Sequence, residues 1–348
     1  MFGLAGLLGL VMVGLSVDMS DDTTASSDGI DAEGADDGDR INTQEAAERA
    51  DSTGAGSIHA FIFGEGEENI TNGTEGNDTI GGTAAADSID GLGGEDVVYG
   101  AAHDDSLSGG AGSDLLDGAG DHDTIDGGPG NDRLQGDFGN DDLNGGAEDD
   151  ELMGQSGTDT MQGGTGNDRL VGGAGADLLS GGDGDDGLMG CVGGDTLIGR
   201  GGADTLNGND GNDTIFGVTP NNGGTPPEDD ATRDYLNGGN GDDALFPGAG
   251  DNANGGAGSD SFTLGDWIAD GGPVLIEDYD ANEDSLVVVY DDAAHPDPEL
   301  TVETAAGTPE NAQLLLDGLP LAEVSGAAGL DPSQVALVAQ SAIEAAAT

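Results

Sequence analysis

The sequence predicts an all-β fold, a parallel β-solenoid in which two nonapeptides close one coil. Three observations lead to this prediction. A nine-residue period runs unbroken through sixteen units from Gly73 to Phe216, every unit opens with glycine, and every unit has Ile, Val, Leu or Met at position 8. The last three residues of a unit suit a very short strand whose eighth side chain points inward. The first six suit a glycine-rich turn, so unit n stacks on unit n+2, eighteen residues later.

The composition excludes several classes of partner. The 348 residues include 69 glycines, 71 acidic residues and only six basic ones, for a formal net charge of −65. Nucleic acid and anionic membrane surfaces would repel such a chain. Aromatic residues make up only 3%, so we expect no thick packed core, and the charge opposes a compact state unless a counter-charge is supplied. The single Cys191 cannot form an internal disulfide.

The regular period ends after Phe216. Residues 217–228 (GVTPNNGGTPPE) are predicted to form a surface loop inserted into the array. We therefore predict one solenoid domain over 73–263, with the insertion inside it. The irregular units after the loop, the third of which has only eight residues, are 229–237, 238–246, 247–254 and 255–263.

Position 6 is aspartate in all sixteen regular units. Stacking would place these carboxylates in columns along two edges, where they repel one another unless a cation lies between them. Carboxylate and turn carbonyl oxygens suit calcium, which accepts about six to eight hard oxygen ligands; magnesium demands a stricter geometry, and zinc would need His or Cys. The predicted ligands are Asp78, Asp87, Asp96, Asp105, Asp114, Asp123, Asp132, Asp141, Asp150, Asp159, Asp168, Asp177, Asp186, Asp195, Asp204, Asp213, Asp243 and Asp260.

The units GGTGNDRLV at 163–171 and GGAGADLLS at 172–180 resemble the haemolysin-type calcium-binding nonapeptide G-G-x-G-x-D-x-U-x of the RTX (repeats-in-toxin) family. The resemblance implies a parallel β-roll with calcium bound between successive turns on each edge. Its ligands would be turn carbonyls and the position-6 aspartates of units n and n+2, which gives about fourteen or more ions. The array is rich in glycine and poor in apolar side chains, so we expect folding to be coupled to metal binding.

Position 4 distinguishes the two edges. It is glycine in twelve of the sixteen regular units, and the exceptions are Ala85, His103, Asp121 and Glu148. A side chain at this position is strained if the turn needs a positive φ. Three of the four exceptions fall on the same edge, so we expect weaker or missing ions there between about residues 82 and 126. His103 and His122 are interpreted as solvated turn residues rather than catalytic groups.

The two ends are not built from regular repeats. Residues 1–17 are uncharged and apolar, and a signal-like or membrane-associated segment and a hydrophobic helix both remain open for them. Residues 18–57 are predicted to be an acidic disordered linker, and 58–72 an N-terminal cap whose strand is IHAFIF at 58–63.

Residues 264–348 are predicted to be a small C-terminal β cap that covers the last coil with the help of Phe262, Trp267 and Tyr279. The family resemblance implies that the tail from about 300 to 348 also serves as an uncleaved signal for the type I secretion machinery. Six segments of the cap suit strands: PVLIEDYD, DSLVVVYDD, ELTVETA, NAQLLLDG, LAEV and QVALVA.

Taken together, these features predict a secreted, extracellular calcium-binding protein, which would fold on external calcium. Its role would be structural, adhesive or part of a cell surface or matrix, with calcium, the type I secretion machinery and surface or matrix components as partners. The alternative is an exported effector or hydrolase whose roll serves secretion and folding. Binding of ice or mineral would require regular Thr or Asx ladders at position 7 or 9, where residues vary. The sequence contains neither an HExxH nor a G-x-S-x-G motif, so we predict that the protein is not an enzyme.

Overall fold

The computed structural model describes residues 59–61, 69–220, 229–268 and 272–346. The chain divides into two compact parts, Met1–Ile41 and Asn42–Thr348, and every described residue belongs to the second. The apolar segment 1–17 and the acidic linker 18–57 predicted from the sequence lie outside the described residues.

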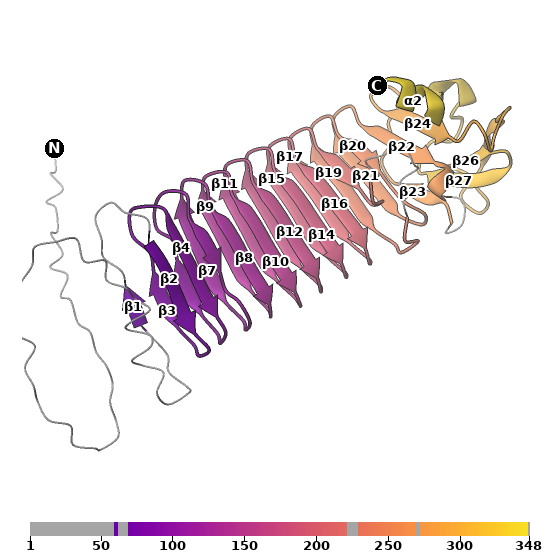
Figure 1. Cartoon of the computed structure of the whole chain (residues 1–348). Coiled ribbons are helices and arrows are strands. Elements are labelled where there is room, and N and C mark those ends of the chain that lie inside the picture. The colour runs from indigo at the N-terminus through magenta and orange to yellow at the C-terminus, as the bar shows by residue number, and fades with distance from the viewer. Residues whose placement is uncertain (1–58, 62–68, 221–228, 269–271, 347–348) are drawn as a thin grey trace, which may run out of the picture. The chain divides into compact units, whose positions relative to one another are not determined.

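The strands of the roll form two parallel sheets, and each sheet grows by every second strand of the chain (Figure 1). The first sheet contains, in spatial order, β1 (His59–Phe61), β3 (Thr79–Gly81), β5 (Val97–Tyr99), β7 (Leu115–Gly120), β9 (Arg133–Phe138), β11 (Glu151–Ser156), β13 (Arg169–Ala174), β15 (Gly187–Val192), β17 (Thr205–Asp210), β19 (Tyr235–Asn240), β21 (Asn252–Ala257), β23 (Val274–Ile276), β27 (Leu319–Val324), β26 (Ala312–Leu316) and β25 (Leu300–Thr304). The second contains β2 (Asn69–Thr74), β4 (Asp87–Leu92), β6 (Ser106–Ser108), β8 (Thr124–Pro129), β10 (Asp142–Ala147), β12 (Thr160–Thr165), β14 (Leu178–Asp183), β16 (Thr196–Gly201), β18 (Thr214–Phe216), β20 (Ala244–Phe246), β22 (Ser261–Gly265), β24 (Ser285–Tyr290) and β28 (Val335–Ala339). The predicted β-solenoid with two nonapeptides in each coil is confirmed.

The register of the sheets follows the sequence period. Leu143 of β10 lies beside Met161 of β12, and Leu152 of β11 lies beside Leu170 of β13, each pair eighteen residues apart. The position-8 side chains of the sixteen regular units all point inward and are buried, each at most 2% exposed. The core is therefore thin, with one large aliphatic side chain for each nonapeptide.

The predicted strand length of three residues is wrong for most units. From β7 to β17 every strand has six residues, which occupy positions 7–9 of one unit and 1–3 of the next. After Asn144, for example, pairing resumes at Gly146 and Ala147, which lie opposite Gly164 and Thr165. The glycines that suit a turn also let the backbones approach closely enough to pair, so only positions 4–6 remain for the turn.

The sheets begin before the first regular unit. β1 pairs in parallel with β3, and β2 pairs in parallel with β4, where Thr71 lies opposite Ile89. Thr71 is buried like the aliphatic residue whose place it takes. The strand predicted over 58–63 contains β1.

The C-terminal cap consists of strands at all six predicted segments. β23, β24 and β28 extend the two parallel sheets, whereas β25, β26 and β27 form an antiparallel meander. Phe262 is buried, with the Tyr279 ring edge-on to it at 6.5 Å between centroids, and Trp267 packs against the same core. All three residues thus belong to the hydrophobic core or pack against it at the end of the roll.

Among the described residues, helical structure is limited to η1 (Asp266–Ile268), η2 (Pro332–Gln334) and α2 (Gln340–Ala346). None of the helices in the described part of the chain is long and apolar enough to cross a membrane.

We predict that Leu152→Ala destabilises the calcium-loaded roll by about 2–5 kcal/mol, because the substitution leaves a cavity in a core with no other large side chain from that unit. Thr160→Ala, at an exposed position of β12 in the other sheet, is the control and should change stability by less than about 0.5 kcal/mol. Denaturant unfolding in excess calcium measures both changes. Equal losses for the two variants would contradict the assignment of position 8 to the core.

Candidate metal centre

Two columns of aspartates run through the turns that precede the strands. Asp150 immediately precedes β11, and its Oδ1 accepts a hydrogen bond of 2.8 Å from the backbone N–H of Asp132, one coil earlier. In the other column, Asp159 Oδ1 accepts the same bond from the Asp141 N–H at 2.9 Å. The bond recurs at every step of both columns, so each aspartate ties its own coil to the preceding one.

All eighteen aspartates predicted as ligands lie in these columns and are buried, none more than 4% exposed. In fifteen of them, Oδ2 is buried and accepts no hydrogen bond from any described residue. A buried charged oxygen without a partner is costly. We call these fifteen the open aspartates: Asp96, Asp105, Asp114, Asp123, Asp132, Asp141, Asp150, Asp159, Asp168, Asp177, Asp186, Asp195, Asp204, Asp213 and Asp243.

The space beside each Oδ2 exists because position 1 is glycine. A Cβ added to Gly145 would collide with Asp150 Oδ2 and with the carbonyl oxygen of Gly163 in the next coil. The same arrangement recurs at Gly127 and at Gly163. A carboxylate oxygen and a carbonyl oxygen thus converge where no side chain fits, and both are the hard ligands that calcium prefers.

Side chains alone do not form the metal centre. Within the described ranges, no three His, Cys, Asp or Glu side chains gather as a metal cluster. Carbonyl oxygens of the turns would therefore have to complete the ligand set around the carboxylates. A carbonyl oxygen that already accepts one hydrogen bond keeps a second lone pair for this purpose. The residues present fit calcium, which accepts mixed carboxylate and carbonyl coordination.

Burial in the columns raises the pKa of the carboxyl groups of the open aspartates. Burial raises the pKa of Asp150 from 3.8 to about 7, against the lowering effect of the hydrogen bond from Asp132, and the charges of Asp132 and Asp168 add to the rise. Burial likewise raises the pKa of Asp105, Asp186 and Asp204 to about 7. Without a cation, the folded roll therefore favours the protonated form of these groups.

A second, exposed ladder lies beside the buried one. Asp149, at position 5, accepts a hydrogen bond of 2.8 Å from the backbone N–H of Asn167 in the next coil, and Asn167 Oδ1 accepts the same bond from Asp185. Position 5 thus reaches forward along the stack, whereas position 6 reaches back. Adjacent side chains therefore fix each turn from both sides.

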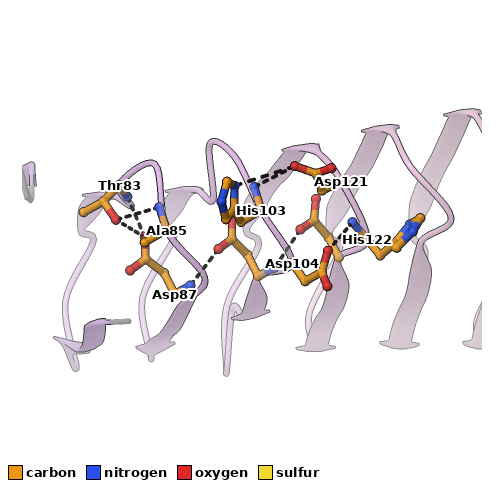
Figure 2. A network of polar contacts seen from close by, with 9 residues as sticks. Thr83, Ala85, Asp87, His103, Asp104, Asp121 and His122 are labelled. Atoms are coloured by element: carbon orange, nitrogen blue, oxygen red, sulfur yellow. Dashed lines mark hydrogen bonds and ion pairs between the residues drawn. The ribbon is translucent and has the colours of Figure 1, made fainter. Parts of the chain in front are cut away.

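Of the four turns with a side chain at position 4, three have a strained backbone. His103, Asp121 and Glu148 have φ of 74°, 75° and 81°, in the left-handed region that favours glycine, whereas Ala85 does not. Figure 2 shows Asp121 lying across the gap between two coils, where its Oδ2 accepts a 3.2 Å bond from the His103 backbone N–H and lies 3.7 Å from His103 Nδ1. The loss of ions on this edge remains a prediction.

The imidazole of His122 belongs to the position-5 ladder, because Nδ1 accepts a 2.8 Å bond from the Asn140 backbone N–H. His122 itself donates its backbone N–H to Asp104 at 3.0 Å (Figure 2). The His122 side chain thus makes the hydrogen bond that Asn or Asp makes at position 5 of other turns.

Two predicted ligands differ from the open aspartates at the first coil. Asp78 Oδ2 accepts hydrogen bonds from the backbone N–H and the hydroxyl of Thr74, at 2.6 and 3.0 Å. Asp87 Oδ2 accepts the same two bonds from Thr83, at 2.5 and 3.0 Å. These carboxylates are satisfied by their own turns.

Sequence reasoning missed two members of the first column, Asp234 and Asp251. Asp234 Oδ1 accepts from the Asp204 N–H, and Asp251 Oδ1 accepts from the Asp234 N–H, each at 2.9 Å. Burial raises the pKa of Asp234 to about 9, and the charge of Asp251 adds to the rise. The irregular unit 229–237 keeps aspartate at its sixth position and leucine at its eighth, which was the signal available.

The second column also extends one residue beyond Asp260, its last predicted member. The Asp260 N–H donates to Asp284 Oδ1 at 2.9 Å, so Asp284 of the cap occupies the place of a further edge aspartate. The residue precedes β24 directly, as the position-6 aspartates precede their strands.

Comparison with known proteins agrees with this geometry. The family model of the RTX calcium-binding nonapeptide repeat matches residues 72–102, 81–116, 99–134, 117–152, 126–161, 153–188, 192–218 and 229–253, which together extend over 72–253. No curated protein matches the chain. The matched residues contain all fifteen open aspartates. The chain belongs to the RTX calcium-binding nonapeptide repeat family.

Proposed function

We propose that the open aspartates hold calcium in two columns along the roll and that the roll folds only when these ions are bound. The single observation that supports this is the buried Oδ2 that accepts no hydrogen bond from any described residue, repeated at fifteen turns. At nine of these turns, a carbonyl oxygen of the next coil lies beside the same space. Bound calcium would supply the positive charge that lets stacked carboxylates stay ionised. The aspartates orient their oxygens through Oδ1, which the preceding coil fixes.

We extend this proposal to export. A chain that cannot fold at low calcium stays unfolded inside the cell and folds at the higher calcium concentration outside. Calcium binds only the folded state, so a higher calcium concentration shifts the folding equilibrium toward that state. The signal for export would lie within residues 300–348. Of this segment, α2 follows the last strand, β28, so it can be removed without removing a strand.

Outside the cell, the proposed role is structural or adhesive at a cell surface or in a matrix, without enzymatic activity. A hollow of about 330 Å³ on the outer face of the first sheet supports an adhesive contact. Asn207, Asn237 and Asn254 follow one another along three successive strands there, beside the exposed ring of Tyr235. Amides beside an aromatic ring, with the carboxylate of Glu277 lining the same hollow, suit a polar partner that donates hydrogen bonds.

The calcium sites are tested by Asp150→Asn. We expect this substitution to weaken calcium binding at the adjoining turns by about tenfold or more, because it removes one charged ligand. The matched control is Asp149→Asn, whose exposed side chain can still accept the hydrogen bond from Asn167. Calcium titration followed by far-ultraviolet circular dichroism measures both. Identical titrations for the two variants would count against the buried column as the binding site.

Acidity gives a second test. The open aspartates have a raised pKa in the folded, calcium-free roll, so their contribution to stability is present below about pH 4 and is lost as the pH rises through about 6 to 7. In calcium-free buffer, we therefore expect β structure to increase when the pH falls from about 8 to about 4. Protons compete with the metal, so calcium affinity should fall over the same range. A circular dichroism spectrum independent of pH in calcium-free buffer would be inconsistent with this assignment.

Export is tested by removing residues 340–348. We expect the truncated chain to remain inside cells that secrete the full chain through a type I system, while calcium still folds the purified variant, because both sheets keep all their strands. Immunoblots of the cell and medium fractions measure export, and circular dichroism measures folding. Unchanged secretion would exclude the last nine residues as a necessary part of the signal.

A further inference from the structure

Position 2 of the nonapeptide divides the regular units into two groups. In the third to sixteenth units, this residue has a positive φ in every case, whether or not it is glycine. The exceptions are the first two units, where Thr74 and Thr83 do not have a positive φ. The non-glycine residues that do adopt it are Leu92, Ala101, Ala119, Asp137, Gln155, Cys191, Arg200 and Asn209.

The type of side chain explains the division. None of those eight residues is branched at Cβ, whereas threonine is. A β-branched residue is a genuine outlier at positive φ, because its two substituents on Cβ crowd the backbone. Thr74 and Thr83 therefore favour the other turn conformation.

In that conformation, the threonine donates hydrogen bonds to the position-6 aspartate of the same turn. The backbone N–H and the hydroxyl of Thr83 both donate to Asp87 Oδ2, and the same hydroxyl oxygen accepts a 3.2 Å bond from the Ala85 N–H (Figure 2). Thr74 makes the equivalent bonds to Asp78 and with Gly76. Bonds to an ionised acceptor are the stronger kind, so these turns stabilise their carboxylates without a cation.

The far ends of both columns show the same chemistry. Asp251 Oδ2 accepts a 2.6 Å bond from the Gly248 N–H, and Asp284 Oδ2 accepts a 2.7 Å bond from the Asp280 N–H. Each donor comes from the turn of the acceptor itself, three or four residues earlier, as at Thr74 and Thr83. In all four terminal aspartates, Oδ2 therefore accepts a hydrogen bond from a backbone N–H group of its own turn. The open aspartates lie between these ends of the columns.

We infer that the residue at position 2 decides whether a turn takes calcium, and that Thr74 and Thr83 close the first coil without an ion. The ion columns then begin at Asp96 and Asp105 rather than at Asp78 and Asp87. The first coil is a calcium-independent end on which the calcium-dependent coils stack, as terminal repeats of solenoids stabilise the array. This inference rests on the proposed function.

The variants that test it are Thr74→Gly and Thr83→Gly, made together in the full chain. Glycine permits positive φ, so both turns should open, and the double variant should bind about two more calcium ions than the wild type, about one for each turn. Thr74→Val with Thr83→Val is the matched control, since valine keeps the β-branch and the backbone N–H bond. It should gain no ion. Equilibrium dialysis with metal analysis measures the stoichiometry, and an unchanged count in the glycine variant overturns the inference.

A second measurement needs no variant and so does not depend on how the variants fold. In crystals of the wild-type chain grown with calcium, anomalous scattering should show ions beside the open aspartates and none beside Asp78 Oδ2 or Asp87 Oδ2. An ion at either of these two atoms overturns the inference and leaves the proposed function intact. The absence of ions beside the open aspartates as well would instead refute the proposed function.

Discussion

The structure depends on one constraint: stacked turns bring like-charged carboxylates into a buried line, and in fifteen of them Oδ2 accepts no hydrogen bond from any described residue. Oδ1 of Asp150 is held by the preceding coil, whereas its Oδ2 has no partner among the described residues. The inward Leu, Ile, Val and Met residues bury little apolar surface per unit, and ordering so many glycines is costly. A cation that binds these oxygens would offset the cost of burying them without a partner. In the RTX calcium-binding nonapeptide repeat family, calcium is that cation.

The turn therefore serves two purposes with few residues. Glycine at position 1 leaves room for the open oxygen, and the side chains at positions 5 and 6 bind the neighbouring coils in opposite directions. At the open aspartates, the position-2 residue has a left-handed backbone and Oδ2 accepts no hydrogen bond from any described residue. Where threonine prevents that conformation, at Thr74 and Thr83, the carboxylate is satisfied by hydrogen bonds instead. A single residue thus separates a turn that needs a counter-ion from one that does not.

The period predicted the parallel coil, the inward column around Leu152 and the buried carboxylates around Asp150, because all three follow from which residues recur every nine and every eighteen positions. The six-residue strands could not be predicted in this way, since pairing at Gly146 and Ala147 depends on the neighbouring coil and not on local propensity. Asp234 and Asp251 were missed because the period is interrupted before them. Thr74 and Thr83 look like ordinary variable residues until the sign of φ at position 2 is known.

The interruption after Phe216 has a consequence for how such arrays change in length. Strand β17 pairs with β19 through Thr205 and Tyr235, thirty residues apart instead of eighteen, yet the Asp204–Asp234 bond keeps its usual 2.9 Å. Each coil pairs only with the coils directly before and after it, so its contacts do not depend on its position along the chain. Whole coils can therefore be duplicated, lost or separated by an insert during evolution without disturbing the rest. Capacity for metal would then scale with the number of coils, while the closed ends stay the same.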